Sequence, residues 1–200
     1  LYTYEICDLT EEKFEKFMTE KNFKGINVTI PYKQKVIPFL DEIDETAKEI
    51  GAVNSIVNKN GKLFGYNTDL FGISNLISKT AGDISEKTVL ILGSGGTSKT
   101  AAYAAKTMGA ARIYKATRKQ DLIPEGDFEY ITYDNIDKIA DFTDIIINTT
   151  PVGMFPNTDA SPINISLFKN LSAVVDAVYN PLKTKLVYTA EKENIPAETG

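Results

Sequence analysis

The sequence Lys87-Thr-Val-Leu-Ile-Leu-Gly-Ser-Gly-Gly-Thr-Ser-Lys-Thr-Ala-Ala-Tyr-Ala-Ala-Lys-Thr-Met-Gly109 decides the fold, because it predicts a strand, a turn and a helix in immediate succession. Val89 to Leu92 form an apolar run without polar alternation, which is typical of a central parallel strand that is covered on both faces. Gly93 ends this run. The residues from about Thr97 to Met108 are rich in alanine and predict a helix that packs closely on a sheet.

The turn between this strand and this helix has the composition of a phosphate-binding loop. Gly95 and Gly96 lack a Cβ atom at the start of the helix, where backbone N–H groups and the helix dipole favour an anion. The spacing matches the dinucleotide-binding pattern G-x-G-x-x-G, except that Ser98 occupies the position of the third glycine. A second strand, Ala111 to Ala116, completes the β-turn-α-β unit. We predict nucleotide binding; the alternative is a Rossmann-like scaffold with an empty crevice.

The end of the second strand indicates which nucleotide is bound. NAD-binding units usually place an acidic residue there for the ribose 2′-hydroxyl, whereas the 2′-phosphate of NADP requires cations. Lys115, Arg118 and Lys119 occupy this stretch, and the first acidic residue after it is Asp121. We therefore predict NADP rather than NAD. The alternative is a solvated basic turn.

Composition narrows the class of protein. The 200 residues include 27 acidic and 22 basic side chains, and the net charge of −5 argues against a nucleic-acid partner. The single cysteine, Cys7, cannot form an internal disulfide, and no apolar run approaches the roughly 20 residues that span a bilayer. We predict a cytoplasmic protein with a small-molecule substrate, without a membrane or nucleic-acid partner, as a monomer or homodimer.

The chain contains no histidine. This excludes dehydrogenases that bind catalytic zinc through Cys and His ligands and those that use a histidine acid/base. Any proton transfer must come from Lys, Tyr, Asp, Glu or water, and no metal site is predicted.

The remaining pattern predicts two α/β domains, with a boundary at the sequence Ala81-Gly82-Asp83. Residues 1–80 form the first domain, and residues 81–200 form a Rossmann domain with a parallel sheet. For the first domain we predict strands at residues 2–7 and 25–30, helices at 10–20, from Pro31 onward, at 42–50 and at 70–79, and a hairpin at 55–66. For the second we predict further strands at 128–132, 144–148 and 173–178 and helices at 135–139 and 184–193.

Two stretches of the first domain place polar side chains where a strand passes into a helix, which is where ligands usually bind in α/β proteins. Thr29 and Lys33 lie in Asn27-Val-Thr-Ile-Pro-Tyr-Lys33, and Asp69 ends Gly65-Tyr-Asn-Thr-Asp69. A lysine and an aspartate brought together could shuttle a proton to a substrate oxygen. Taken singly, Lys33 is better interpreted as a surface lysine and Asp69 as a plain helix N-cap.

Six motifs together resemble the shikimate dehydrogenase family, in the same order and over nearly the whole chain. They are Asn27 to Lys33, Gly51-Ala-Val-Asn54, Gly65 to Asp69, the glycine turn, Asn148-Thr-Thr-Pro-Val-Gly-Met154 and Asp176-Ala-Val-Tyr-Asn-Pro-Leu182. The resemblance implies a two-domain enzyme that reduces 3-dehydroshikimate to shikimate with NADPH, in the biosynthesis of chorismate and the aromatic amino acids.

The resemblance also implies roles for particular residues. Lys33 is the acid/base, Asp69 is its partner and a substrate ligand, and Thr29, Asn54 and Tyr179 are further substrate contacts. The implied cofactor contacts are Gly93, Ser94, Gly95, Gly96 and Thr97 at the pyrophosphate, Lys115, Ala116, Thr117, Arg118, Lys119 and Gln120 at the adenosine phosphate, and Thr149 to Met154, Ala177 and Gly200 at the nicotinamide half.

The chain departs from the family pattern in two ways. The family usually has Asn-Arg-Thr after the second strand, where this chain has Lys115-Ala-Thr117, so bidentate phosphate recognition is weakened unless Arg118 or Lys115 substitutes. The family's N-terminal strand with two serines, and its C-terminal helix with a glutamine, lie outside these 200 residues. For these residues alone we expect weak substrate binding at best.

Three alternatives stay open. A short-chain dehydrogenase would need Tyr-x-x-x-Lys on a helix at the active site. That spacing occurs at Tyr179 to Lys183, where Pro181 disrupts a helix, and at Tyr188 to Lys192, on a helix that we expect to lie far from the cleft. A quinate or broader-specificity dehydrogenase is the close alternative. A non-catalytic NADP sensor is the third, although such a sensor would be expected to lose Lys33 or Asp69.

Overall fold

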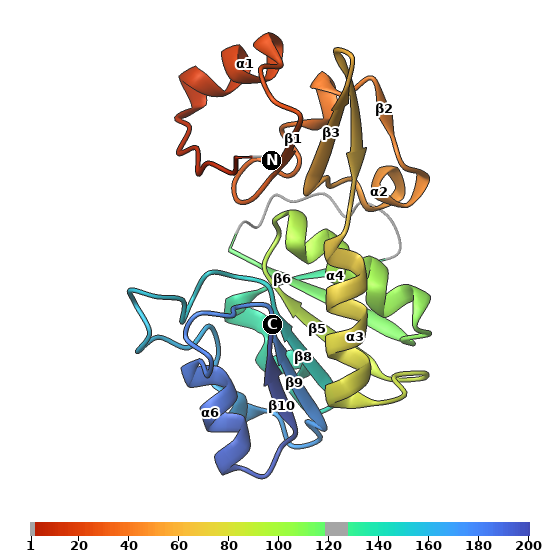
Figure 1. The fold of residues 1–200 in the computed structure, drawn as a ribbon. Helices are drawn as coiled ribbons and strands as arrows, with labels where there is room; N and C mark the ends of the chain where they lie inside the picture. Colours follow the sequence, from red (N-terminus) through yellow and green to blue (C-terminus); the bar gives the residue numbers. More distant parts are fainter. Residues whose placement is uncertain (1–2, 119–127) are drawn as a thin grey trace. The chain divides into compact units, whose positions relative to one another are not determined.

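The computed structural model describes residues 3–118 and 128–200 (Figure 1). Contacts divide the chain into two units, Leu1–Asn67 and Thr68–Gly200. We predicted the boundary near residue 80, after helix α3 (Asp69–Ala81). The contacts divide the chain before this helix instead, between Asn67 and Thr68. This helix belongs to the second unit because its buried Ile73 and Ile77 pack in the core of that unit.

The first unit is built around a four-stranded sheet in the order β1-β3-β4-β2. Strands β3 and β4 form the predicted antiparallel hairpin, and the positive φ angles of Asn60 and Gly61 (55° and 85°) make its turn. The elements of this unit are α1 (Glu11–Glu20), β1 (Gly25–Asn27), the 3-10 helix η1 (Ile37–Phe39), β2 (Glu42–Ile43), α2 (Glu45–Ile50), β3 (Ser55–Lys59) and β4 (Lys62–Tyr66).

Three sequence-based predictions for this unit are wrong. Residues 3–10 form no strand. Among the described residues, β1 is an edge strand that pairs only with β3, so residues 3–10 do not pair with it. No α-helix begins at Pro31: the Lys33 carbonyl accepts the N–H of Val53 (2.8 Å), and the Ile37 N–H, which would bond to Lys33 in an α-helix, donates to the Gln34 carbonyl instead (3.3 Å). The helix predicted at 42–50 is shorter, because the Asp44 side chain caps α2 by accepting the N–H of Thr46 (3.1 Å).

The second unit is a six-stranded sheet in the order β10-β9-β8-β5-β6-β7, and every neighbouring pair is parallel. The predicted Rossmann sheet is confirmed, with a short edge strand, β10, that we did not predict. The elements after α3 are β5 (Thr88–Leu92), α4 (Gly96–Thr107), β6 (Arg112–Thr117), β7 (Glu129–Thr132), η2 (Tyr133–Asn135), α5 (Asp137–Ala140), β8 (Ile145–Asn148), η3 (Ile165–Leu167), β9 (Ala173–Asp176), α6 (Lys185–Lys192) and β10 (Ala197–Thr199).

Two apolar cores cover the two faces of this sheet. On one face α3 and α4 pack on the strands, and four alanines of α4 are completely buried there. On the other face Ile139 and Ala140 of α5 and Leu186 of α6 pack against Leu90 and Ile146. The central strands are buried on both sides, as their uninterrupted apolar sequence predicts. Their polar groups are therefore confined to the strand ends.

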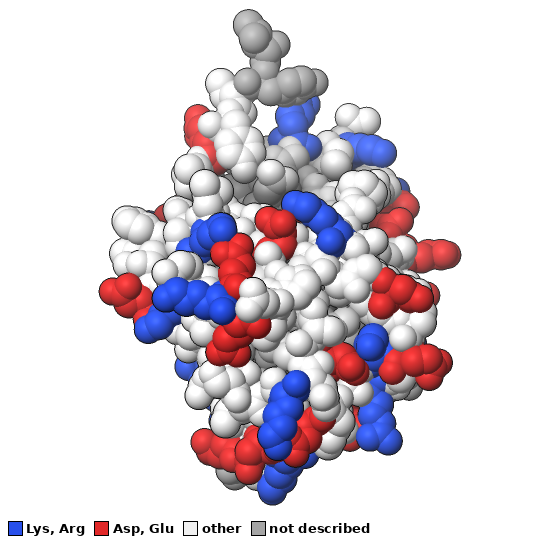
Figure 2. All heavy atoms as spheres, turned by 90° about the horizontal axis from the view of Figure 1, so that it is seen from below, with Lys and Arg blue, Asp and Glu red and all other residues white. Residues whose placement is uncertain are grey.

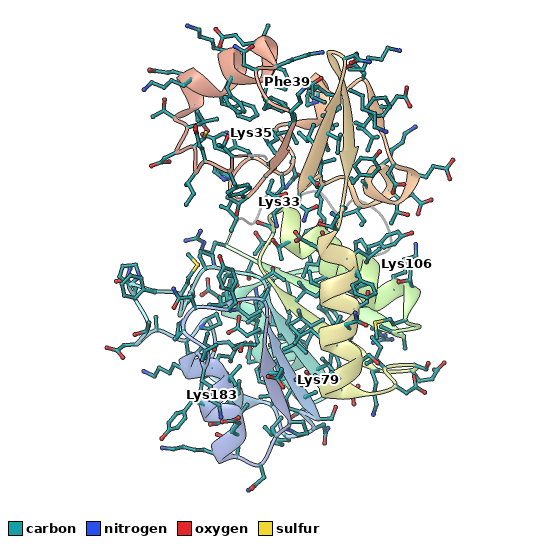
Figure 3. The ribbon with its side chains drawn as sticks, in the orientation of Figure 1. Lys33, Lys35, Phe39, Lys79, Lys106 and Lys183 are labelled. Atoms are coloured by element: carbon teal, nitrogen blue, oxygen red, sulfur yellow. The ribbon has the colours of Figure 1, made fainter. Side chains whose placement is uncertain are left out.

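The surface of the chain mixes charges of both signs. On the face shown in Figure 2, acidic and basic side chains lie interspersed. Ion pairs include Lys79 with Glu198 (2.9 Å) and Lys183 with Glu191 (2.8 Å), and Figure 3 labels both lysines. Among the described residues, no helix is long and apolar enough to cross a membrane.

Candidate functional site

The glycine turn joins β5 to α4 at the carboxyl end of the sheet. Gly93 has a φ of +116°, and a Cβ atom there would lie 2.8 Å from Thr149 Oγ1, so a side chain is excluded by conformation and by space. Gly95 is extended, and no atom lies within 4 Å of where its Cβ would be. Helix α4 begins at Gly96. The backbone of the turn is thus open to a ligand above Gly95.

Ser98 explains why the third glycine of the fingerprint is dispensable here. Its side chain is completely buried, and its hydroxyl donates a hydrogen bond to the Gly93 carbonyl (2.7 Å). The small side chain therefore permits close packing of α4 on the sheet and ties the helix to the turn. The predicted residues Ser94 and Gly95 are exposed, and Thr97 is partly exposed. Because the first turn of an α-helix carries N–H groups without intrahelical acceptors, this arrangement suits an anionic group.

The order of the strands places this turn at the centre of the sheet. The chain runs outward from β5 through β6 to β7, then returns to the other side of β5 and continues through β8 and β9 to β10. The order reverses between β5 and β8. In doubly wound folds dinucleotides bind across the strand ends at this reversal. The glycine turn after β5 and the loop after β8 flank it, and Thr149 Oγ1 joins them by donating to the Leu92 carbonyl (2.6 Å).

The carboxyl end of β6 presents fewer cations than its sequence indicates. Lys115 is only 3% exposed, and its Nζ lies 5.5 Å from the ring centroids of both Phe128 and Tyr130. Ala116 and Thr117 are also buried, whereas Arg118 is exposed. Burial argues against phosphate contacts from the first three side chains and favours Arg118. The predicted contacts Lys119 and Gln120 lie outside the described residues.

Arg118 has an electrostatic neighbour in Tyr133, which follows the adjacent strand β7. Burial raises the pKa of the Tyr133 phenol, and the positive charge of Arg118 opposes this increase. The guanidinium therefore acts near Tyr133 at the start of η2, at the same edge of the sheet as the glycine turn.

The loops after β8 and β9 bring together the residues predicted for the nicotinamide half. Ala177 donates its N–H to the Asn148 carbonyl (2.8 Å), and Gly200 donates to the Asp176 carbonyl (2.8 Å). Thr149, Ala177 and Gly200 thus follow three neighbouring strands at one edge. Met154 is 41% exposed and Tyr179 is 71% exposed on the two loops, which are joined by the N–H of Phe155 and the carbonyl of Asn180 (3.0 Å).

Three buried polar residues beneath these loops were not predicted. Asn148 and Asp176 end neighbouring strands and face each other in register, and Thr184 precedes α6. Asp176 accepts hydrogen bonds from the Asn148 amide (2.9 Å) and the Thr184 hydroxyl (2.7 Å). Burial raises the pKa of the Asp176 carboxyl, although its hydrogen bonds oppose part of the increase. The signal in the sequence was a polar residue at the end of two otherwise apolar strands.

In the first unit, backbone hydrogen bonds bring the segments that carry Thr29, Lys33 and Asn54 close together. The Lys33 carbonyl accepts the N–H of Val53, and the Asn54 carbonyl accepts the N–H of Val28 (2.7 Å). Thr29 follows directly and is exposed, while Lys33 and Asn54 are partly buried. Thr29, Lys33 and Asn54 therefore lie close together. Asp69 begins α3 in the second unit, and its pairing with Lys33 stays a prediction.

Lys35, two residues after Lys33, has a different environment. It forms an ion pair with Glu11 of α1, and its Nζ lies 5.9 Å from the centroid of the Tyr32 ring. Figure 3 labels both lysines on the same segment. Lys35 is thereby held against α1, which makes it a suitable control for Lys33.

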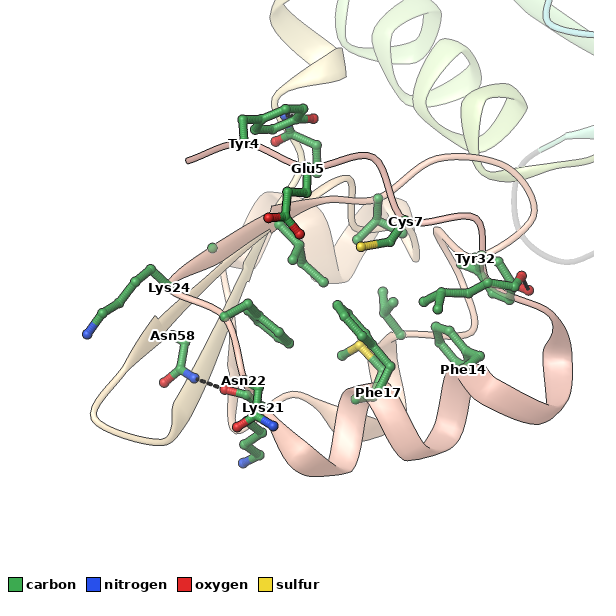
Figure 4. Close-up of a pocket in the computed structure, with 18 of the residues that line it drawn as sticks. Tyr4, Glu5, Cys7, Phe14, Phe17, Lys21, Asn22, Lys24, Tyr32 and Asn58 are labelled. Carbon is green, nitrogen blue, oxygen red and sulfur yellow. Dashed lines mark hydrogen bonds between the residues drawn. The ribbon is translucent and has the colours of Figure 1, made fainter. Parts of the chain in front are cut away.

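The first unit also contains a large cavity, of about 1100 Å³, between residues 3–9, α1 and β1 (Figure 4). Phe14, Phe17 and Met18 from α1 and Ile26 and Val28 around β1 line it. Thr29 reaches its wall, whereas Lys33 and Asn54 are not part of the lining. The cavity, whose lining is both polar and apolar, thus meets the polar cluster at Thr29.

No metal site accompanies these groups in the described part of the chain, where no three His, Cys, Asp or Glu side chains gather in a way that could hold an ion.

Comparisons with known proteins agree with this geometry. The family model described as "Shikimate dehydrogenase substrate binding domain" matches residues 1–56. The shikimate dehydrogenase (NADP(+)) of Clostridium beijerinckii is 35% identical over 96% of this chain and 72% of its own length. That of Methanococcus maripaludis strain C6 is 38% identical over 100% of this chain and 75% of its own length.

Solved structures give the same result. Shikimate dehydrogenase 1 from Peptoclostridium difficile superimposes with a TM-score of 0.89 at 34% identity, over 97% of this chain and 73% of that protein. The Thermus thermophilus enzyme, solved in complex with NADP(H) and shikimate, gives a TM-score of 0.78 at 29% identity, over 96% of this chain and 74% of that protein. From its sequence and its fold, the chain belongs to the shikimate dehydrogenase family.

Proposed function

We propose that this chain is an oxidoreductase that interconverts 3-dehydroshikimate and shikimate with NADP(H), a step of aromatic amino acid biosynthesis. The observation that carries the proposal is the agreement of two independent features. The glycine turn stands at the reversal of strand order in a sheet that matches family members throughout. The first unit, in turn, carries the family's substrate-domain sequence together with Lys33 and its polar neighbours.

The residues of the second unit fit a dinucleotide phosphate. The open backbone at Gly95 and the N-terminus of α4 suit the pyrophosphate, and the exposed Arg118 suits a 2′-phosphate. The loops after β8 and β9 would receive the nicotinamide half, with Thr149, Met154 and Ala177 at its edge. NADP(H), when bound, supplies or accepts the hydride.

The first unit supplies the acid/base group. When hydride adds to the carbonyl carbon of the substrate, the oxygen acquires negative charge and requires a proton. Lys33 is the proposed donor, because its ammonium can give one N–H proton to that oxygen and recover it in the reverse direction. Asp69 is proposed to hold this amine and a substrate hydroxyl, and Thr29, Asn54 and Tyr179 to fix the remaining hydroxyl groups. The lack of histidine leaves few other groups for this task.

Quinate or broader substrate specificity is the nearest alternative. A quinate dehydrogenase of Corynebacterium glutamicum, solved in complex with NAD, gives a TM-score of 0.76 at 26% identity. The two substrates differ at the ring, where quinate carries an additional hydroxyl. A sensor that binds NADP without catalysis is the other alternative. The presence of both Lys33 and Asp69 argues against it.

The proposal predicts that the chain reduces NADP when shikimate is added, and that the rate falls at least several-fold with NAD or with quinate. Initial rates at 340 nm with the four combinations of substrate and cofactor test this. Faster turnover of quinate with NAD would assign the chain to the alternative specificity. Cofactor binding without turnover of either substrate would favour the sensor.

Replacement of Lys33 by alanine should lower kcat by about 10²–10⁴-fold without changing the dissociation constant of NADP, because the acid/base is lost and the nucleotide site is not. Lys33→Arg should fail as well, since a guanidinium does not release its proton near neutral pH. Lys35→Ala is the matched control and should retain nearly full kcat. Weaker NADP binding by the Lys33→Ala variant would instead assign a structural role to this lysine.

Replacement of Arg118 by alanine should raise KM for NADP about tenfold and leave KM for NAD unchanged, because only NADP carries the phosphate that the guanidinium binds. Arg112→Ala, an exposed arginine at the opposite end of β6, is the control. Steady-state kinetics with both cofactors measure the difference. Equal losses for NADP and NAD would contradict the assignment of the 2′-phosphate contact to Arg118.

A further inference from the structure

A chain of buried hydrogen bonds runs beneath the two loops that follow β8 and β9. Its centre is Asp176, whose side chain is completely buried and receives three hydrogen bonds. The Asn148 amide and the Val178 N–H donate to Oδ1 (2.9 and 3.0 Å), and the Thr184 hydroxyl donates to Oδ2 (2.7 Å). One carboxylate therefore joins the end of β8, the start of the β9 loop and the residue before α6.

The chain of contacts continues into the loop after β8. Asn148 Oδ1 accepts both the N–H and the hydroxyl of Thr150 (3.0 and 2.7 Å), and Thr150 Oγ1 in turn accepts the N–H of Val152 (3.3 Å). The orientation of the Asn148 amide is set by Asp176, because a carboxylate only accepts and so requires the NH₂ side of the amide. Asn148 must then present its oxygen to Thr150.

At its other end, this series of hydrogen bonds reaches the start of α6. Thr184 Oγ1 accepts the N–H of Val187 (3.3 Å) while its hydroxyl hydrogen points to Asp176, so the hydroxyl caps the helix and anchors the loop between β9 and α6. Exposed Tyr179 lies on this loop.

The carboxylate is costly for stability alone. It is removed from water, and its described hydrogen-bond donors are neutral groups. Desolvation of a carboxylate without a cationic partner disfavours its charged form, and a neutral side chain of the same shape would avoid that cost. What the charge provides is direction, since a pure acceptor fixes the orientation of Asn148 and Thr184 at once.

We propose that Asp176 is a positioning residue that fixes the two loops in the shape that receives the nicotinamide half of the cofactor. This inference rests on the proposed function, because it assumes that a dinucleotide lies across the strand ends. It adds that the two halves of the cofactor depend on different interactions: the adenosine half on the glycine turn and β6, and the nicotinamide half on the buried chain from Thr150 to Thr184.

The variant Asp176→Asn tests the proposal, because it keeps the shape of the side chain and removes its pure acceptor character. Calorimetric titration should show NADP binding about tenfold weaker, with the dissociation constant of adenosine 2′,5′-bisphosphate unchanged, since that probe does not reach the two loops. The Tm should stay within about 4 °C of the unaltered chain. Asp144→Asn, at the opposite end of β8, is the control and should alter neither ligand.

A second pair of variants covers the case in which Asp176→Asn fails to fold. Thr184→Val removes the hydroxyl at nearly constant volume and should weaken NADP selectively in the same way, whereas Thr184→Ser keeps the hydroxyl and should restore binding. Unchanged NADP affinity in both Asp176→Asn and Thr184→Val would overturn the inference, and so would equal weakening of NADP and the bisphosphate. Failure of the unaltered chain to bind NADP would refute the proposed function and this inference with it.

Discussion

A parallel sheet that is buried on both faces can offer polar groups to a ligand only where its strands end. In this chain β5, β8 and β9 are covered by helices on both sides, so their side chains along the strands are committed to the two apolar cores. Every strand of the sheet ends at the same edge because all are parallel. The glycine turn, Thr149 and Ala177 meet there for that reason, although they are far apart in the sequence.

The residues at the end of each strand give different parts of this edge different properties. β5 is followed by the glycine turn, whose backbone is accessible at Gly95, whereas β8 and β9 end in Asn148 and Asp176, which are buried and hydrogen-bonded to each other. The first arrangement suits an anion. The second builds a rigid base beneath two exposed loops. At the end of β6, among the described residues, Lys115 is buried and Arg118 is exposed.

The sequence was sufficient to predict the features that depend on local pattern. The apolar runs, the glycine turn and the Asn60-Gly61 hairpin appear where they were expected. What it could not reveal depends on contacts distant in sequence. The Lys33 carbonyl is paired with the Val53 N–H in place of a helical partner. Lys115 is basic in sequence, but it is buried with its Nζ 5.5 Å from the ring centroids of Phe128 and Tyr130. Local pattern carries no information on such partners.

The central claim is that a dinucleotide lies across the carboxyl ends of β5, β8 and β9. Amide hydrogen exchange with and without NADP tests it most directly, because slowed exchange locates the bound ligand along the backbone. The account predicts slower exchange in residues 94–98, 149–154 and 177–180, with residues 185–192 of α6 unchanged. Protection confined to residues 21–28, which line the cavity of the first unit, or no protection at residues 94–98, would contradict it.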